Sequence, residues 1–277
     1  MLIAHIADLH VSADGRPVHD LVDTDAATRG VIEAVNAARP DVVLVAGDLT
    51  HDGDLAAAER ARAMLAGVDA SVYVCPGNHD SRDTLRAAFG RRTDDVCDDW
   101  MAYAVEDLPV RLIAMDAATD DPMVGELAAS QVAWLAERLA EQPERPTAIF
   151  LHHPPFDTGI DWLDQIGISR GRDDLGAVLA AHRNVRALLC GHLHRPMRGG
   201  WYGAPVLAAP SVMDRVAFVG ENPDGSPVAA IAAPPGFALH RVVNGTWRPD
   251  LCFLNGHFEE WQAALPDPWA KNSGRLP

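Results

Sequence analysis

The sequence predicts an α/β fold, because short apolar segments of strand length alternate along the chain with amphipathic segments of helical period. The apolar segments are continuous rather than alternating, which is typical of strands buried on both faces of a sheet. Five of them lead directly into polar residues that can bind a ligand. These observations predict a buried sheet with chemical groups gathered at its strand ends.

The first part of the chain contains three expected strands and two expected helices. The strands at 2–7, 42–46 and 72–75 consist almost wholly of apolar residues. Between them, the segment 25–38 places small and branched apolar residues on one side, and the segment 55–66 has a similar period. This part therefore predicts two consecutive strand–helix–strand units.

The same alternation continues from residue 112 to residue 190. Strands are expected at 112–115, 148–151 and 185–190, each an apolar run. Helices are expected at 130–140 and 173–182; in the first, the apolar residues are spaced by three and four positions, at Val132, Leu135 and Leu139.

After Pro210 the character of the sequence changes. Pro and Gly cluster from Asn222 to Gly236, and the segment 237–243 predicts a strand that ends in an Asn244-Gly245 hairpin turn. We expect one domain over residues 1–277, with a catalytic core at about 1–210 and a C-terminal strand or extension at about 211–277. The extension could equally serve an oligomer interface.

The composition fits a folded globular chain. Of 277 residues, 48% are hydrophobic and 22% are charged, which is too apolar for general disorder. Asp and Glu number 39 against 23 Lys and Arg, a formal net charge of −16. Such a field repels polyanions, so nucleic acid is not expected as a partner, and a nuclease is disfavoured unless a local basic patch opposes the overall charge.

The four cysteines form no closely spaced pair, so neither a zinc knuckle nor a disulfide framework is indicated. Cys75 and Cys190 lie in apolar runs and are expected to be free thiols in a reducing compartment. The sequence shows no apolar stretch of membrane-spanning length and no basic start typical of a signal peptide. We therefore expect a cytoplasmic protein with no membrane partner.

Five polar motifs follow the expected strands. Because the ligand crevice of an open α/β sheet lies beyond the carboxyl ends of its strands, we expect these motifs to surround one hollow. Glycines within them would allow sharp turns and close approach. The motifs are Asp8-Leu9-His10, Gly47-Asp48, Gly77-Asn78-His79-Asp80, His152-His153-Pro154-Pro155 and Gly191-His192-Leu193-His194.

The side chains of these motifs suit transition-metal ions. Imidazole mixed with carboxylate favours Mn, Fe, Co, Ni or Zn over Ca or Mg. Seven such donors are more than one first-row ion uses, so two ions are expected, with Asp48 bridging them. Taken singly, an Asp or Asn in these positions is usually a turn former. Their joint occurrence after buried strands favours the metal interpretation, with ligands Asp8, His10, Asp48, Asn78, His152, His192 and His194.

In this order and spacing, the motifs resemble the calcineurin-like metallophosphoesterase superfamily over roughly residues 1 to 210. Pro76 before Gly-Asn-His-Asp, and the stretch 152–155 followed by Gly159 and 162–165, resemble the class III cyclic-nucleotide phosphodiesterases and the related bacterial glycerophosphodiesterases. The protein Ser/Thr phosphatases usually carry Arg-Gly-Asn-His-Glu, from which this chain departs.

The resemblance implies a four-layer α/β/β/α sandwich of the metallo-dependent phosphatase type and two divalent or mixed-valence ions (Mn, Fe, Zn or Co). His79 would stay off the ions and act as a catalytic residue close to the phosphate. A homodimer or higher homo-oligomer is also plausible by this resemblance. The first ion would be held by Asp8, His10, Asp48 and His194, and the second by Asp48, Asn78, His152 and His192.

We expect such a site to hydrolyse small phosphodiesters, such as 3′,5′-cyclic AMP or glycerophosphodiesters, by attack of a hydroxide that bridges the ions. A phosphomonoesterase or a nucleotide pyrophosphatase on the same site is an alternative. A non-catalytic scaffold with the same fold is a further alternative, although such a protein could dispense with several of the ligands.

Other polar residues receive structural interpretations. Asp80 is expected to cap the next helix or to orient His79, and Asp116 to support the site or the fold. His5 is expected in the core, and strand alternation would turn His153 away from the ligands.

Three features could contact substrate. His51 and Arg195 follow ligand motifs on loops. The loop at 156–168 has few signals of regular structure and contains Trp162, which could stack on a substrate or pack on the core.

Overall fold

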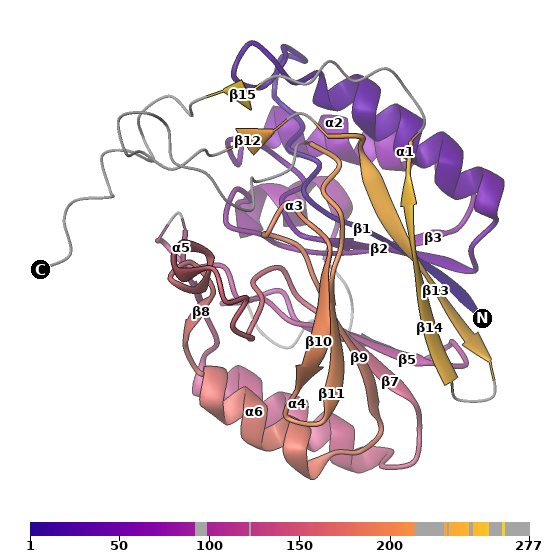
Figure 1. Cartoon of the computed structure of the whole chain (residues 1–277), viewed down its shortest axis with the longest axis vertical. Coiled ribbons are helices and arrows are strands. Elements are labelled where there is room, and N and C mark those ends of the chain that lie inside the picture. Colours follow the sequence, from indigo (N-terminus) through magenta and orange to yellow (C-terminus); the bar gives the residue numbers. More distant parts are fainter. Residues whose placement is uncertain are drawn as a thin grey trace, which may run out of the picture.

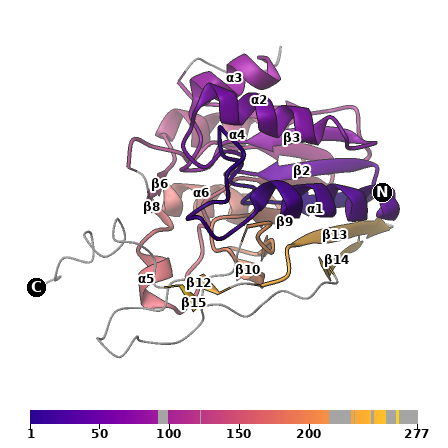
Figure 2. The same cartoon turned by 90° about the horizontal axis from the view of Figure 1, so that it is seen from above.

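Two β-sheets lie face to face between two layers of helices in the computed structural model (Figure 1). This is the four-layer sandwich that the resemblance implied. Seen from above, one of the two helical layers lies in front of the sheets (Figure 2). The structure describes residues 1–91, 99–121, 123–213, 230–231, 233–243, 246–254 and 262–263.

The first sheet has the strand order β14-β13-β1-β2-β3. Strands β1 (Leu2–Ile6), β2 (Val42–Ala46) and β3 (Ser71–Cys75) are parallel, and β13 (Gly236–Val243) runs antiparallel to β1. β14 (Thr246–Phe253) pairs antiparallel with β13. The connecting helices are α1 (Thr24–Ala38), α2 (Leu55–Leu65) and, after β3, α3 (Arg82–Phe89).

The second sheet has the strand order β10-β11-β9-β7-β5-β4. Helices α4 (Ala129–Glu141) and α6 (Arg172–Ala181) cover its outer face (Figure 1). Shorter elements are helix α5 (Asp161–Asp164) and the pairs β6 (Gly125–Glu126) with β8 (Ile168–Arg170) and β12 (Ala230–Ile231) with β15 (Gln262–Ala263). The six strands are β4 (Tyr103–Val105), β5 (Arg111–Ala114), β7 (Thr147–Phe150), β9 (Val185–Cys190), β10 (Met197–Trp201) and β11 (Ala204–Ala208).

Alternate residues of the central strands contribute to different cores. In β2, Val43 and Val45 pack with residues of α1 and α2, whereas Leu44 packs between the sheets. In β7, Phe150 packs between the sheets and Ile149 packs with residues of α4 and α6. Because each face of a strand meets an apolar layer, these strands are continuously apolar in sequence.

The ten elements expected before residue 190 all form, with their ends within two residues of the expected positions. The sequence interpretation missed α3, β4, β10 and β11, and it was wrong in treating 156–168 as a loop, since α5 lies there. Residues 199 and 200 of β10 are both Gly, and β11 contains Pro205, residues that are depleted in strands. The compositions of β10 and β11 therefore favour loops, which is why the sequence interpretation missed these two strands.

The C-terminal strand prediction is confirmed by β13, which extends the first sheet beside β1. Its partner β14 places Thr246 opposite Val243. The predicted turn at 244–245, Cys97, most of the Pro- and Gly-rich segment and the final segment from 255 lie outside the described residues, apart from 262–263. Among the described helices, none is both long and apolar enough to cross a membrane.

Asp116 directly follows β5 and holds three separate segments together. Its carboxylate accepts hydrogen bonds from Arg82 Nε at 2.6 Å, from the Met101 backbone N–H at 2.8 Å and from the Ala118 backbone N–H at 3.0 Å. The carboxylate is buried, whereas Arg82 is partly exposed. These bonds fit the structural role expected for Asp116.

Replacing Asp116 with Asn is expected to lower the free energy of unfolding by on the order of 3 kcal/mol, because an amide leaves the Arg82 charge and a buried donor unmatched. Urea denaturation followed by circular dichroism measures the change. Asp14→Asn is the matched control: the ion pair of Asp14 with Arg16 is exposed to solvent, so its loss should change the free energy of unfolding far less. Equal losses in both variants would contradict the structural role of Asp116.

Candidate metal centre

The seven predicted ligands come together at the carboxyl ends of five strands. Two follow β1, one follows β2, one follows β3, one follows β7 and two follow β9, so both sheets contribute. The expectation that widely separated motifs surround one centre is therefore met. The side chains of Asn78 and His194 are partly exposed and the other five residues are buried, namely Asp8, His10, Asp48, His152 and His192.

Asp48 lies between two groups of donors. Its Oδ2 atom is 3.5 Å from His10 Nε2 and 3.2 Å from His152 Nε2. One group adds Asp8 and His194 to His10 and Asp48: the His10 and His194 Nε2 atoms are 3.1 Å apart, and Asp8 Oδ1 is 3.8 Å from His194 Nε2. The donor atoms of this group all lie within 4.8 Å of one another.

The second group contains Asp48, His152 and His192, with Asn78 beside them. Asn78 Oδ1 is 3.0 Å from His152 Nε2 and 2.9 Å from His192 Nδ1, and these two nitrogens are 3.1 Å apart. Oxygen and nitrogen donors therefore converge here as they do in the first group.

Both groups fit a divalent cation chemically. Asp8 Oδ2 is buried and has no hydrogen-bond partner among the described residues, and such a buried polar atom is costly unless an ion or donor satisfies it. Burial lowers the pKa of His10 and of His192 well below the usual value, which favours the neutral imidazole that binds metals. Burial also raises the pKa of Asp8, and a nearby positive charge would offset this effect.

Two of the histidines are oriented by backbone carbonyls. His152 Nδ1 lies 2.8 Å from the Ala46 carbonyl oxygen, and His192 Nε2 lies 3.0 Å from the Ile166 carbonyl oxygen. Each ring donates its N–H outward to the carbonyl, which turns the other ring nitrogen toward the donor group. The carbonyl of Ile166 was missed in the sequence interpretation, because a backbone group has no signature in sequence.

Five of the seven residues have a left-handed backbone, which non-glycine residues rarely adopt. Their φ angles are 59° for Asp8, 46° for His10, 51° for Asp48, 69° for His192 and 48° for His194. Each such conformation costs free energy and persists where the surrounding structure holds it, often at functional sites. Sharp chain reversals therefore aim these side chains inward.

Glycines make room for this convergence, as the sequence predicted. Gly47 has φ +83°, and a Cβ atom there would collide with the His152 ring. A Cβ atom at Gly77 would collide with the Asp48 carboxylate. The two positions therefore require the absence of a side chain.

Gly47→Ala is expected to lower the free energy of unfolding more than Gly159→Ala does. The expected difference between the two variants is about 1–3 kcal/mol. Both glycines have a left-handed φ, but no atom lies within 4 Å of a Cβ at Gly159. The difference between their unfolding midpoints in urea therefore isolates the contact with His152. Equal midpoints would show that His152 moves aside at no cost.

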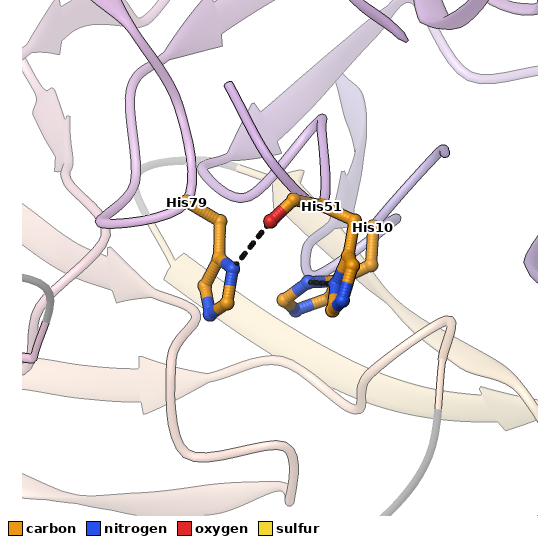
Figure 3. Close-up of side chains that lie close together, drawn as sticks. All are labelled: His10, His51 and His79. Atoms are coloured by element: carbon orange, nitrogen blue, oxygen red, sulfur yellow. Dashed lines mark hydrogen bonds between the residues drawn. The ribbon is translucent and has the colours of Figure 1, made fainter. Parts of the chain in front are cut away.

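His79 lies at the edge of the two groups. Its Nδ1 atom donates to the His51 carbonyl oxygen at 2.7 Å (Figure 3). Its backbone N–H donates to Asp48 Oδ1 at 2.9 Å. Its ring centroid is 4.6 Å from that of His10. Potential ligand atoms of His10, His51 and His79 also lie within 4.8 Å of one another.

Asp80 does not cap the next helix, one of the two roles expected of it. Ser81 occupies the N-cap position of α3, and the Asp80 carboxylate instead accepts hydrogen bonds from Leu49 N, Thr50 N, Thr50 Oγ1 and Gly77 N at 2.8–3.1 Å. Burial, together with the nearby Asp48 carboxylate, raises the pKa of Asp80 to about 6. Asp80 therefore ties the loop after β2 to the loop after β3.

The remaining polar candidates lie around the centre. His5 is buried beside His240, with ring nitrogens 3.4 Å apart, as expected for a core residue. His153 is not turned away: its ring packs against His152 and His192, with centroid distances of 5.0 and 4.5 Å. Trp162 packs against the core of the second sheet, and Arg195 is partly buried outside both donor groups.

The family model of the calcineurin-like phosphoesterases matches residues 1–196. The chain belongs to this family. The chain is 30% identical to a glycerophosphodiester phosphodiesterase, GpdQ, of Enterobacter lignolyticus, with 89% of each sequence covered. It is 32% identical to the 3′,5′-cyclic adenosine monophosphate phosphodiesterase CpdA of Escherichia coli, covering 76% of this chain and 75% of that one.

Among solved structures, a dimetal phosphatase from Danio rerio matches the fold with a TM-score of 0.67. The match covers 91% of this chain and 96% of the other at 19% identity. The four-layer architecture is thus that of the family.

Proposed function

We propose that this calcineurin-like phosphoesterase is a two-metal phosphodiesterase that hydrolyses small diesters, with 3′,5′-cyclic nucleotides or glycerophosphodiesters as substrates. The observation that carries the proposal is the position of Asp48, whose carboxylate lies between two separate groups of imidazole nitrogens. The activities for which the GpdQ and CpdA relatives are named support the substrate class. The net charge of −16 favours a small substrate over nucleic acid.

The proposed cofactor is a pair of divalent or mixed-valence ions of Mn, Fe, Zn or Co, which suit mixed imidazole and carboxylate ligands. When bound, such a pair lowers the pKa of water toward neutrality and offsets charge on the phosphoryl group. We assign the first ion to Asp8, His10, Asp48 and His194, and the second to Asp48, Asn78, His152 and His192.

The residues of the chain have separate roles in this proposal. Asp8 and Asp48 supply the negative charge that balances the cations, and the carbonyls of Ala46 and Ile166 orient two of the histidines. His79 donates from Nδ1 to the His51 carbonyl, which leaves Nε2 as the atom that can protonate the leaving oxygen or hold a non-bridging one.

The first test is metal content together with ester preference. Purified protein reconstituted with Mn²⁺ is expected to hold two ions per chain by plasma mass spectrometry and to hydrolyse bis(p-nitrophenyl) phosphate. Hydrolysis of p-nitrophenyl phosphate alone would make it a phosphomonoesterase. Protein that binds no ion and hydrolyses neither compound would favour the scaffold alternative.

The second test identifies the diester. The reconstituted enzyme should be screened with cyclic AMP, 2′,3′-cyclic nucleotides and glycerophosphoethanolamine at matched concentrations. The substrate with the highest kcat/KM defines the branch of the family to which the activity belongs. A nucleotide pyrophosphatase would instead prefer a dinucleotide or nucleoside diphosphate ester included in the same screen.

We also propose a homodimer or a higher homo-oligomer in a reducing compartment such as the cytoplasm. Among the described cysteines, Cys75 and Cys190 are free and buried, which supports the reducing environment. Two-fold oligomers are the commonest type among soluble oligomeric proteins. Light scattering coupled to gel filtration measures the number of chains per particle.

A further inference from the structure

The ring nitrogens that face away from the donor groups decide which tautomer each histidine adopts. A metal-binding histidine usually donates its other N–H to a carboxylate, carbonyl or water, and this outer bond sets ring orientation and basicity. His152 and His192 each have a backbone carbonyl in this position. No side-chain substitution can remove those two acceptors directly.

His10 differs from these two. Its Nε2 atom faces Asp48 and His194, so Nδ1 is the outer nitrogen. The neighbour of Nδ1 is the side chain of His51, whose Nδ1 atom lies 3.5 Å away (Figure 3). A side chain therefore occupies the place that a carbonyl has at the other two histidines.

The second ring nitrogen of His51, Nε2, faces a carboxylate, and this favours Nδ1 as the hydrogen-bond acceptor of the ring. His51 Nε2 lies 4.0 Å from the Asp52 carboxylate, which favours a proton on Nε2 and leaves the Nδ1 lone pair free. The His10 Nδ1–H can then donate to His51 Nδ1. His10 in this tautomer presents an unprotonated Nε2 to Asp48 and His194.

The His51 ring is held in place on several sides. Its backbone N–H donates to the Val11 carbonyl at 3.0 Å, and its own carbonyl accepts from His79 Nδ1 at 2.7 Å. Its ring stacks on that of His79, with an interplanar angle of 16°, and meets the exposed His19 ring edge-on. Residue 51 therefore contacts the metal-ligand candidate His10 through its side chain and the catalytic candidate His79 through both its carbonyl and its ring.

We propose that His51 is a positioning residue that accepts a hydrogen bond from His10 and so fixes the tautomer with which His10 binds the first cation. The proposal rests on the two-metal function proposed above and adds a residue outside the seven ligands to it. Because His51 contacts only the first donor group in this way, it acts on one cation and not on the other.

The test compares two substitutions of His51 in the full-length protein. His51→Asn places a carbonyl oxygen near the position of Nδ1 and can still accept, whereas His51→Phe retains a flat ring without an acceptor. The probe is Co²⁺, added to the metal-free protein and followed by visible absorption and by competition with a chelator. His19→Phe is the control, since His19 packs on His51 but belongs to neither donor group.

We expect His51→Phe to weaken one of two Co²⁺ binding steps by about 10–100-fold and to alter the visible spectrum of that step only. His51→Asn should keep the affinity within a few-fold of wild type, and His19→Phe should leave both steps unchanged. His51→Leu, assessed by circular dichroism, provides a second variant without an acceptor if the Phe variant does not fold.

Three results would overturn the inference. Unchanged binding by both His51→Phe and His51→Leu would show that His10 needs no acceptor there. Equal weakening by His51→Asn and His51→Phe would show that packing alone is responsible. Failure of the wild-type protein to bind two Co²⁺ ions would refute the proposed function itself, a result separate from the first two.

Discussion

Asp48→Asn is expected to abolish the binding of both ions and to lower kcat/KM for a diester by at least about 10³-fold, equivalent to about 4 kcal/mol of transition-state stabilisation. The amide keeps the size of the side chain and can still accept from the His79 backbone N–H. What it removes is the negative charge between His10 and His152. Both donor groups lose their common carboxylate in a single substitution.

Metal content by plasma mass spectrometry and turnover of bis(p-nitrophenyl) phosphate measure this effect together. Asp116→Asn serves as the control, because it alters another buried aspartate that lies outside both donor groups. That variant should be less stable but should still hold two ions. Full metal content and activity in Asp48→Asn would refute the bridging role of Asp48.

His79→Asn is expected to lower kcat by about 10²–10⁴-fold while metal content stays at the wild-type level. An Asn amide can replace the donation from Nδ1 to the His51 carbonyl, but it has no counterpart of Nε2. The substitution therefore removes the atom assigned to proton transfer and retains the local hydrogen bond. Steady-state kinetics and metal analysis on the same preparation measure the two effects.

A histidine away from the centre provides the comparison for this prediction. His182 follows α6, so His182→Asn should leave kcat unchanged. Loss of an ion from His79→Asn would place His79 among the metal ligands. A wild-type kcat in that variant would remove His79 from the proposed mechanism.

The sequence predicted the central strands well because of how they are buried. In β2 and β7, one face meets the opposite sheet and the other meets helices, so both strands consist of unbroken apolar runs. The turn that follows each strand must then carry the first polar residues. The positions of Asp8, Asp48 and His152 at strand ends were predictable for this reason.

Other features could not be read from sequence for physical reasons. Gly199, Gly200 and Pro205 lower the strand propensity of β10 and β11, whose pairing is decided by tertiary contacts. The Ile166 carbonyl that orients His192 belongs to a backbone group common to every residue. Asp80 was assigned to a helix cap because of its place in the chain, whereas its partners lie about thirty residues earlier, at 49 and 50.

The candidate metal centre combines residues that are synthesised early with residues that are synthesised much later. Asp8 and His194 lie in one donor group. His194 is added to the growing chain 186 residues after Asp8. A nascent chain cannot assemble either donor group until β9 has emerged and entered the second sheet. Cation loading is therefore expected late in biosynthesis, after the apolar layers have formed, unlike in small zinc domains whose folding requires the ion.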